Sequence, residues 1–387
     1  MYLKKLTLIN YRNYCHAELE FLPGINIFFG DNAQGKSNLL ESIYLLGRGK
    51  SYRTVNDESL IRWGEDFFQI RAEISNYNQS LVEEVFFSLH QRRSVRVNRE
   101  RISSLRRLPQ IFPLVLFSPD DLQLIKGGPQ ARRGYLDELL GVVFPEYYDA
   151  TLRYRRALLQ RNNLLRRGSG AVLEQAEPWE RLLSYQGARI VAHRLYLLPH
   201  LAASIRSHFG AIFGSDEPLE VSYCSSVPPD WQTSLSGASE LEYYLREVVS
   251  QVEERLAGAL IASRRGDRQR GSTSVGPHRD DLVFRLQGKE IRYYASQGQQ
   301  RAAALALRLA QLEILDRWLR ERPILLMDDV FSELDEGHRR ALMDSLDLRR
   351  QVFLTATSLD LIPNWGGLRG SARCWRVKVG CLVPEDE

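Results

Sequence analysis

Residues 30–37 are Gly-Asp-Asn-Ala-Gln-Gly-Lys-Ser, which fill every defining position of a phosphate-binding loop. An apolar run, residues 25–29, precedes the loop, and a helical stretch, residues 38–46, follows it. This strand–loop–helix order is the context that the motif requires. The glycines let successive backbone N–H groups turn toward phosphate oxygens, and the helix adds the positive end of its dipole. The pattern predicts ATP or GTP binding; the alternative is a plain strand, turn and helix.

Three side chains in or near this loop carry its expected chemistry. Lys36 is expected to reach the β- and γ-phosphates and to act in catalysis, and the Ser37 hydroxyl is expected to ligate Mg²⁺. Arg12 is expected either to approach the bound nucleotide or to cap the first turn. The predicted nucleotide-binding residues are therefore Arg12, Gly30, Asp31, Asn32, Ala33, Gln34, Gly35, Lys36 and Ser37.

A second motif supplies the carboxylates that a metal–nucleotide site needs. Residues 323–327, Pro-Ile-Leu-Leu-Met, form an apolar run typical of a buried parallel strand, and Asp328-Asp329 follows directly. Ligands of open α/β sheets bind at the carboxyl ends of strands. Asp328 is therefore expected to hold Mg²⁺, and Asp329 is expected to orient or deprotonate the attacking water as a catalytic residue. The alternative is an acidic turn after a core strand.

A third motif lies 32 residues before Asp328 and resembles the signature turn of ABC ATPases. Ser296-Gln297-Gly298-Gln299 opens a long amphipathic helix, and a helix N-terminus is a natural site for an anion. Ser and Gly at a helix start are also plain caps. In ABC ATPases such a turn contacts the γ-phosphate bound by the other subunit. The resemblance therefore implies a homodimer in which Ser296, Gln297, Gly298 and Gln299 act in trans.

The residues after the two aspartates extend this resemblance and also limit it. Residues 330–335, Val-Phe-Ser-Glu-Leu-Asp, are similar to the D-loop at the dimer interface of ABC ATPases, in which Ser332 and Asp335 are the candidate residues. ABC ATPases usually carry a histidine after the next strand, where this chain has Thr355 and Thr357. The usual glutamate after the metal-binding aspartate is replaced by a shorter aspartate. Both departures indicate weak hydrolysis.

The hydrophobic pattern divides the chain into three segments. Residues 1–133 mix strands and turns around the loop, residues 134–270 are rich in Leu and Arg at helical spacing, and residues 271–387 alternate strand and helix. We therefore predict an α/β fold, a P-loop ABC-type ATPase head of mixed sheet plus helices with an inserted, mainly helical lobe. Residues 264–274 are expected to form a polar loop, and residues 95–98 an exposed strand.

Arginine dominates the basic residues. Of the 52 basic side chains 7 are Lys, which leaves 45 Arg. The planar fork of arginine suits phosphate groups, although a GC-biased genome produces the same excess. Arginines crowd residues 92–107, 153–167 and 264–270, and such clusters either bind a polyanion or form solvated faces. The candidate DNA contacts are Arg92, Arg93 and Arg96.

The sequence lacks the patterns of several other protein classes. No run of about 18 apolar residues exists, and the N-terminus lacks the apolar core and cleavage site of a signal peptide. The four cysteines are scattered, without metal-ligand spacing. We therefore expect a cytoplasmic protein that has no membrane partner.

Together with these motifs, further segments make the chain resemble the RecF family of bacterial recombination and gap-repair ATPases over nearly its full length. These segments are residues 10–14 (Asn-Tyr-Arg-Asn-Tyr), 50–54 (Lys-Ser-Tyr-Arg-Thr), 117–122 (Phe-Ser-Pro-Asp-Asp-Leu) and 276–281 (Gly-Pro-His-Arg-Asp-Asp). The resemblance implies a head like that of SMC and Rad50 proteins without the long coiled coil. It also implies ATP and Mg²⁺ as cofactors, an ATP-dependent homodimer, weak DNA-stimulated ATPase activity and binding to single-stranded, double-stranded and gapped DNA. RecO and RecR are the implied partners in loading RecA.

Three other functions stay open at this point. A phosphate-loop kinase acting on a small molecule would not need the turn at residues 296–299. The nucleotide subunit of an ABC transporter would normally keep the switch histidine and would not need an Arg-rich helical lobe. An SMC-like structural scaffold would bind ATP with negligible turnover.

Overall fold

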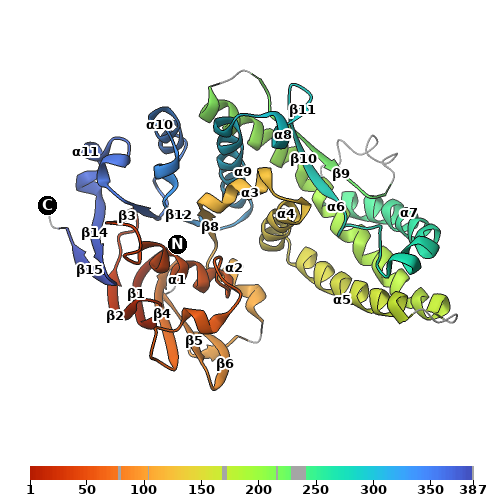
Figure 1. Cartoon of the computed structure of the whole chain (residues 1–387), viewed down its shortest axis with the longest axis horizontal. Coiled ribbons are helices and arrows are strands. Elements are labelled where there is room, and N and C mark those ends of the chain that lie inside the picture. Colours follow the sequence, from red (N-terminus) through yellow and green to blue (C-terminus); the bar gives the residue numbers. More distant parts are fainter. Residues whose placement is uncertain (77–79, 103, 168–171, 215–216, 228–240, 386–387) are drawn as a thin grey trace. The chain divides into compact units, whose positions relative to one another are not determined.

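The computed structural model describes residues 1–387 except 77–79, 103, 168–171, 215–216, 228–240 and 386–387 (Figure 1). Contacts within the chain group the residues into two units. Unit 1 comprises Met1–Asp121, Ala211–Gly214 and Leu305–Glu387, and unit 2 comprises Leu122–Gly210 and Ser215–Ala304. The predicted three-part division, with boundaries at residues 133 and 270, stays a prediction.

The first sheet of unit 1 brings the carboxyl ends of its parallel strands to one edge. Its strand order is β15-β14-β3-β13-β12-β8, and only the β14–β15 pair is antiparallel. The apolar runs at 25–29 and 323–327 form strands in which every residue is buried, as predicted, because both faces of a central parallel strand are covered. The strands are β3 (Ile25–Phe29), β8 (Leu114–Phe117), β12 (Ile324–Met327), β13 (Val352–Ala356), β14 (Ala372–Lys378) and β15 (Cys381–Pro384).

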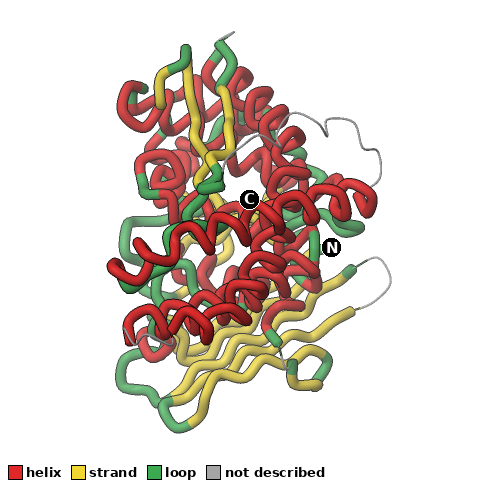
Figure 2. The backbone as a smooth tube through the Cα atoms, turned by 90° about the vertical axis from the view of Figure 1, so that its right-hand side faces the viewer, coloured by secondary structure: helices red, strands yellow, loops and turns green. Residues whose placement is uncertain are grey.

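The second sheet of unit 1 is antiparallel, in the order β2-β1-β4-β5-β6-β7. Figure 2 shows its long strands side by side. Alternate residues of β4, Ile70, Ala72 and Ile74, are fully buried, so this sheet has one face in the core. The strands are β1 (Tyr2–Tyr11), β2 (Tyr14–Glu20), β4 (Phe67–Ser75), β5 (Ser80–Ser88), β6 (Gln91–Val97) and β7 (Glu100–Arg101).

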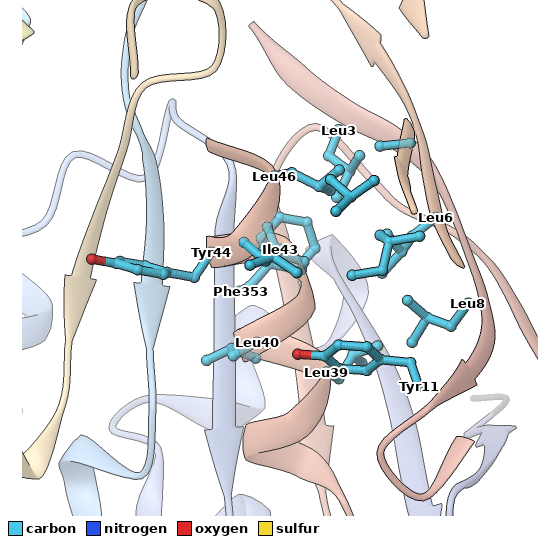
Figure 3. Packing of buried hydrophobic residues seen from close by; sticks show 14 of the residues in the cluster. Leu3, Leu6, Leu8, Tyr11, Leu39, Leu40, Ile43, Tyr44, Leu46 and Phe353 are labelled. Atoms are coloured by element: carbon cyan, nitrogen blue, oxygen red, sulfur yellow. The ribbon is translucent and has the colours of Figure 1, made fainter. Parts of the chain in front are cut away.

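Helix α1 (Lys36–Arg48) packs between the two sheets and connects the phosphate-binding loop to the core of unit 1. In Figure 3, Leu39, Ile43 and Leu46 of α1 face Leu6 and Leu8 of β1, and all five are fully buried. Full burial of each such side chain contributes about 1.5–3 kcal/mol. The remaining helices of the unit are α2 (Leu108–Ile111), α10 (Glu336–Asp344) and α11 (Trp365–Leu368), with 3₁₀ turns at Asp57–Leu60, Leu105–Arg107, Val330–Glu333, Leu359–Leu361 and Arg369–Ser371.

Unit 2 is mainly helical, with a small three-stranded sheet in the order β11-β10-β9. None of the described helices, including its long α5, α6 and α7, has an apolar stretch long enough to cross a membrane. Its elements are α3 (Gln123–Lys126), α4 (Pro129–Val143), α5 (Pro145–Arg167), α6 (Val172–Phe213), β9 (Glu220–Cys224), α7 (Leu241–Arg270), β10 (Asp281–Leu286), β11 (Lys289–Glu290) and α8 (Ile291–Tyr294). Boundaries between the units fall within α6, after Gly210, within helix α9 (Gln297–Trp318) and within the 3₁₀ turn Pro119–Leu122.

Two local predictions from the sequence are wrong. Residues 264–270 are not a loop, because α7 continues to Arg270 and ends before Gly271, which has a φ of 66°. Within this stretch Asp267 is fully buried and pairs with Arg161, whereas Arg265, Arg268 and Arg270 are exposed. The strand expected to be exposed at residues 95–98 is exposed only on the face of Arg96, since Val95 is 2% exposed and belongs to the core.

Glu83 of β5 is a fully buried carboxyl group, and neither of its oxygens has a hydrogen-bond partner among the described residues. Burial raises the pKa of Glu83 well above its ordinary value. A pKa raised in the folded state means that stability falls as the pH rises above the unfolded-chain pKa of about 4.3, because only the unfolded chain then ionises freely.

We expect Glu83→Met to raise the free energy of unfolding by about 1–3 kcal/mol at pH 8. The gain in the free energy of unfolding should shrink at pH 5, where burial of Glu83 costs the parent chain less free energy. Glu84→Met, at the neighbouring half-buried position that contacts Gln69, is the matched control and should give no gain. Denaturant unfolding at both pH values measures the difference, and an equal gain at pH 5 and pH 8 would contradict this prediction.

Candidate nucleotide-binding site

The phosphate-binding loop joins β3 to α1, and its backbone adopts conformations that require glycine. Gly30 and Gly35 have φ angles of 141° and 116°. A Cβ atom on Gly30 would lie 2.6 Å from the Val377 carbonyl oxygen, and one on Gly35 would lie 2.4 Å from the Asn13 side chain. Both close approaches leave room only for a hydrogen atom, so these glycines set the curvature of the loop.

Lys36 is the first residue of α1, and its ammonium group lies against the loop. Nζ donates hydrogen bonds to the carbonyl oxygens of Gly30 (2.5 Å) and Asp31 (2.7 Å). Burial lowers the pKa of Lys36, while the carboxylates of Asp329, Asp31 and Asp328 oppose the shift. The structure therefore places this cation within the loop whose N–H groups are suited to phosphate.

Asp328 follows β12, and three hydroxyl groups donate hydrogen bonds to its carboxylate. Ser37 Oγ lies 2.8 Å and Thr355 Oγ1 3.0 Å from Oδ1, and the Tyr52 hydroxyl lies 2.7 Å from Oδ2. The two residues predicted to hold the metal, Ser37 and Asp328, are thus adjacent although 291 positions separate them. Mg²⁺ prefers hard oxygen ligands and usually binds one or two carboxylates together with substrate phosphates, so this donor set fits the ion.

Asp329 combines a strained backbone with an unpaired buried oxygen. Its φ is 50°, in the left-handed region, and its N–H donates to Thr355 Oγ1 at 2.8 Å. Oδ1 is buried and has no hydrogen-bond partner among the described residues. Burial raises the pKa of Asp329, and the nearby Asp328 carboxylate adds to the shift. Strain and an unsatisfied carboxylate oxygen together are features of functional sites.

Arg12 binds a buried carboxylate of α1. Its Nε and Nη2 donate to the two oxygens of Glu41 at 2.9 and 2.8 Å, and Nη1 donates to the Ser59 carbonyl oxygen at 2.8 Å. Glu41 is fully buried and also accepts a hydrogen bond from Ser51 Oγ. Arg12 therefore ties the start of the chain to α1, and its predicted contact with nucleotide stays a prediction.

A cavity of about 970 Å³ opens beside the phosphate-binding loop within unit 1. Gly30, Asp31 and Gln34 line it from the loop, and Arg376 and Lys378 line it from β14. Its size falls at the upper end of the range for small-molecule sites.

The signature turn, residues 296–299, lies at the N-terminus of α9, as predicted. Ser296 and Gln299 form a reciprocal capping box: the Ser296 N–H donates to Gln299 Oε1 at 2.8 Å, and the Gln299 N–H donates to Ser296 Oγ at 3.2 Å. Ser296 and Gln297 are exposed, and Gly298 is partly exposed. The turn is therefore a regular helix cap, and its first two residues are open to solvent.

The D-loop candidates lie between β12 and α10. Ser332 is exposed and donates to the Asp329 carbonyl oxygen at 2.8 Å. Asp335 caps α10, since its Oδ1 accepts from the His338 N–H at 2.9 Å and its Oδ2 lies 2.6 Å from His338 Nδ1. Hydrogen bonds from the His338 backbone and side chain lower the pKa of Asp335. Both residues thus have local structural contacts.

The arginine clusters do not form uniform basic faces. Arg93 pairs with Asp57 at 2.7 Å, whereas the more exposed Arg96 lies 3.9 Å from Glu84. The Arg92 side chain lies outside the described residues. In the second cluster Arg161 is fully buried, so its interpretation as a surface contact for polyanions is wrong.

Sequence reasoning missed three hydroxyl and amide side chains that shape the site: Tyr52 and Thr355 at Asp328, and Asn13 at the loop. Tyr52 lies in the segment 50–54, which the family resemblance did point to. Thr355 stands at the position of the switch residue in the sequence, and the structure buries it against Asp328.

Comparisons with known proteins identify the family. The model of the RecF/RecN/SMC N terminal domain matches residues 2–365. The DNA replication and repair protein RecF of Heliobacterium modesticaldum is 37% identical over 391 residues, which cover 100% of both chains. That of Bacillus cereus is 38% identical over 366 residues, or 93% of each chain.

Solved structures agree with this assignment. A structure of the recombination mediator protein RecF-ATP in the RecFOR pathway matches with a TM-score of 0.86 and 33% identity, and covers 100% of this chain and 98% of that one. An SMC head bound to the C-winged helix domain of ScpA matches with a TM-score of 0.56 at 14% identity over 99% of this chain and 97% of that one, which shows the fold alone. The predicted ABC-type ATPase head is confirmed, and the chain belongs to the RecF/RecN/SMC family.

Proposed function

We propose that this chain is a cytoplasmic, ATP-dependent DNA-binding ATPase of recombinational repair and replication that dimerises when it binds ATP. The observation that carries the proposal is the 2.8 Å contact between Ser37 and Asp328. It joins the phosphate-binding loop and the end of β12 into one site for a metal-bound nucleotide. Relatives named as DNA replication and repair proteins, which match over the full length, and a similar solved structure of RecF-ATP support it.

In this proposal the loop holds the phosphates, and Ser37 with Asp328 holds Mg²⁺. The ion, when bound, neutralises charge on the β- and γ-phosphates. Lys36 exchanges its two loop carbonyl partners for phosphate oxygens, which are stronger, charged acceptors. The cavity beside the loop offers room for the rest of the nucleotide.

Asp329 is the proposed base that accepts a proton from the attacking water. We expect Asp329→Asn to lower the rate of ATP hydrolysis by about 10²–10⁴-fold while ATP binding is kept. Because burial raises its pKa, the rate should fall with decreasing pH through a midpoint above the ordinary aspartate value of about 3.9. Asp344→Asn, an exposed change in α10, is the control. A mutant that hydrolyses ATP like the parent would show that another group takes the proton.

Hydrolysis measured with and without gapped DNA separates the remaining candidates. A weak rate that DNA stimulates supports the proposal. Negligible turnover in both conditions favours an SMC-like scaffold, a candidate supported by the absence of a switch histidine and by the burial of Thr355. Phosphate transfer to a small molecule without any effect of DNA would favour a kinase.

The dimer is proposed to form because each site lacks a γ-phosphate contact that the other copy supplies. Ser296, Gln297, Gly298 and Gln299 at the start of α9, of which the first two are exposed and the last two partly exposed, provide N–H groups and a helix dipole for that contact. Ser332 and Asp335 are the D-loop residues proposed at the same interface. A ligand that binds only the dimer shifts the equilibrium toward it.

Sedimentation with ATP tests the shared site. Ser296→Arg should remain monomeric, because a large cation at the turn occupies the space of the γ-phosphate and removes the cap. Ser296→Thr keeps the capping hydroxyl and should dimerise like the parent. Dimerisation of Ser296→Arg at parental affinity would rule out the shared site.

DNA binding is proposed to use backbone phosphates of single-stranded, double-stranded and gapped DNA, so affinity should be independent of sequence and fall steeply with salt. Arg96 is better placed than Arg93, because Arg93 is already paired with Asp57 and Arg96 is more exposed. RecO and RecR are proposed partners, supported by the RecFOR pathway named for the similar RecF-ATP structure.

A further inference from the structure

Two hairpin turns hold the phosphate-binding loop from outside, and the function proposed above uses neither. The first joins β1 to β2. Its Asn13 Nδ2 donates to the Gln34 carbonyl oxygen at 2.9 Å, and the buried Tyr14 hydroxyl donates to the Gly35 carbonyl oxygen at 2.9 Å. Asn13 is fixed in turn, because its Oδ1 accepts a hydrogen bond from Asn38 of α1 at 2.8 Å.

The second turn, Val379-Gly380, joins β14 to β15, since Lys378 pairs with Cys381. The Gly380 N–H donates to the Gln34 carbonyl oxygen at 3.0 Å, and the Val379 N–H donates to Gln34 Oε1 at 2.7 Å. A single residue of the loop, Gln34, therefore receives three donors from two hairpins.

The direction of these bonds matters because the C=O and N–H of a trans peptide point in opposite directions. The Gln34 carbonyl shares a peptide plane with the Gly35 N–H, and the Gly35 carbonyl shares one with the Lys36 N–H. Hairpin donors hold the Gln34 carbonyl, and Tyr14 holds the Gly35 carbonyl together with the Leu39 N–H of α1 at 3.1 Å. Both N–H groups of these peptides therefore point the other way, to the concave side where phosphates bind. We propose that Asn13, Tyr14, Val379 and Gly380 are positioning residues that aim these two amides; this inference rests on the nucleotide site proposed above.

The Val379-Gly380 turn is poorly suited to its conformation by itself. Its φ angles are 48° and 74°, the two-residue hairpin geometry that usually contains Asn-Gly. A β-branched residue at positive φ is an outlier, and the Val379 side chain is 73% exposed, so packing does not hold it there. The hydrogen bonds that Val379 and Gly380 donate to Gln34 hold the turn in this conformation. The loop and the C-terminal hairpin thus stabilise each other, and a change in one alters the other.

Binding of ADP and AMP, measured by calorimetry, tests the role of the turns. ADP lacks the γ-phosphate, so the result does not depend on dimerisation and stays distinct from the Ser296→Arg test. Tyr14→Phe removes one hydroxyl, and Gly380→Ala places a Cβ atom 2.4 Å from the Asn13 carbonyl oxygen. Each should weaken ADP binding about fivefold or more, and AMP binding less, since the aimed amides serve the second phosphate.

Gly288→Ala is the matched control. Gly288 closes the two-residue hairpin between β10 and β11 with a φ of 73°, and a Cβ atom there meets nothing within 4 Å. It carries the same backbone strain without touching the loop and should bind ADP like the parent. If Tyr14→Phe and Gly380→Ala, shown to be folded by thermal unfolding, bind ADP with parental affinity, the proposal is wrong. Equal weakening by Gly288→Ala would also overturn it.

A pair of substitutions tests the strained turn itself. Gln34→Met removes the acceptor for the Val379 N–H and should weaken ADP binding about fivefold. Adding Val379→Gly should restore most of the affinity, because glycine adopts a positive φ without help. A double variant as weak as Gln34→Met would overturn the role given to Val379.

Discussion

Lys36→Met is expected to lower the affinity for ATP and for ADP by at least about 100-fold. The ammonium group is already held at the loop by two carbonyl oxygens, and phosphate oxygens replace them with charge-assisted hydrogen bonds worth about 1.5–3 kcal/mol each. Methionine keeps the length and the apolar stem of the side chain but cannot donate. Equilibrium binding with Mg²⁺ measures the loss, and ATP-dependent retention on DNA should disappear with it.

The expected loss of nucleotide affinity depends on the position of the Lys36 charge, so the control variant removes a lysine elsewhere in unit 1. Lys4→Met removes an exposed lysine from β1 and should leave nucleotide affinity unchanged. Thermal unfolding shows whether Lys36→Met is folded. Binding of ATP by folded Lys36→Met within about threefold of the parent would mean that the loop does not hold phosphate as proposed.

The sequence predicted the parts of this site that are local in the chain. Residues 30–37 contain the glycines, the lysine and the hydroxyl in one segment, so the spacing alone fixes their relative positions. The apolar run at 323–327 predicted a central strand, and its end predicted Asp328 beside the loop, because parallel strands bring their carboxyl ends together. The 2.8 Å contact of Ser37 with Asp328 has the geometry that this reasoning requires.

The contacts that complete the site could not be predicted, because they join distant segments through common residue types. A tyrosine at position 52 has no pattern that indicates a hydrogen bond to Asp328, 276 positions away. The turn at Val379 is harder still to predict, since two-residue turns rarely contain a β-branched residue. The pairing of β14 with β3 brings that turn to the loop, where hydrogen bonds to Gln34 hold its conformation.

Arg161 shows how composition misled the sequence interpretation. It lies among exposed arginines of α5, and a count of positive charge cannot distinguish it from them. The structure buries it completely, with Nη1 2.8 Å from Asp267 and 2.9 Å from Thr273, and Nη2 3.0 Å from Glu180. The partners belong to α6 and α7 and to the segment after α7, so this one side chain joins the long helices of unit 2.

Arg161→Met is expected to destabilise unit 2 by about 3–5 kcal/mol, because it leaves two buried carboxylates without their shared cation. Burial alone would raise the pKa of Asp267, and hydrogen bonds from Ser274, Arg161 and Ser263 reverse this and keep it below its ordinary value. Without Arg161 that balance shifts toward a higher pKa. The loss of stability should therefore be largest at neutral pH and shrink as the pH falls and Asp267 takes up a proton.

Two further variants test whether the loss of stability in Arg161→Met comes from the buried charges. Arg155→Met removes an arginine of the same helix that is 66% exposed and paired with Asp137, and should cost at most about 1 kcal/mol. Asp267→Asn added to Arg161→Met should recover part of the loss, because it removes a buried charge that has lost its contact with Arg161 while keeping an oxygen for Ser274. Denaturant unfolding measures all three. If the double variant is less stable than Arg161→Met, or if the loss does not depend on pH, packing around the side chain is what stabilises the lobe, and the buried charges do not.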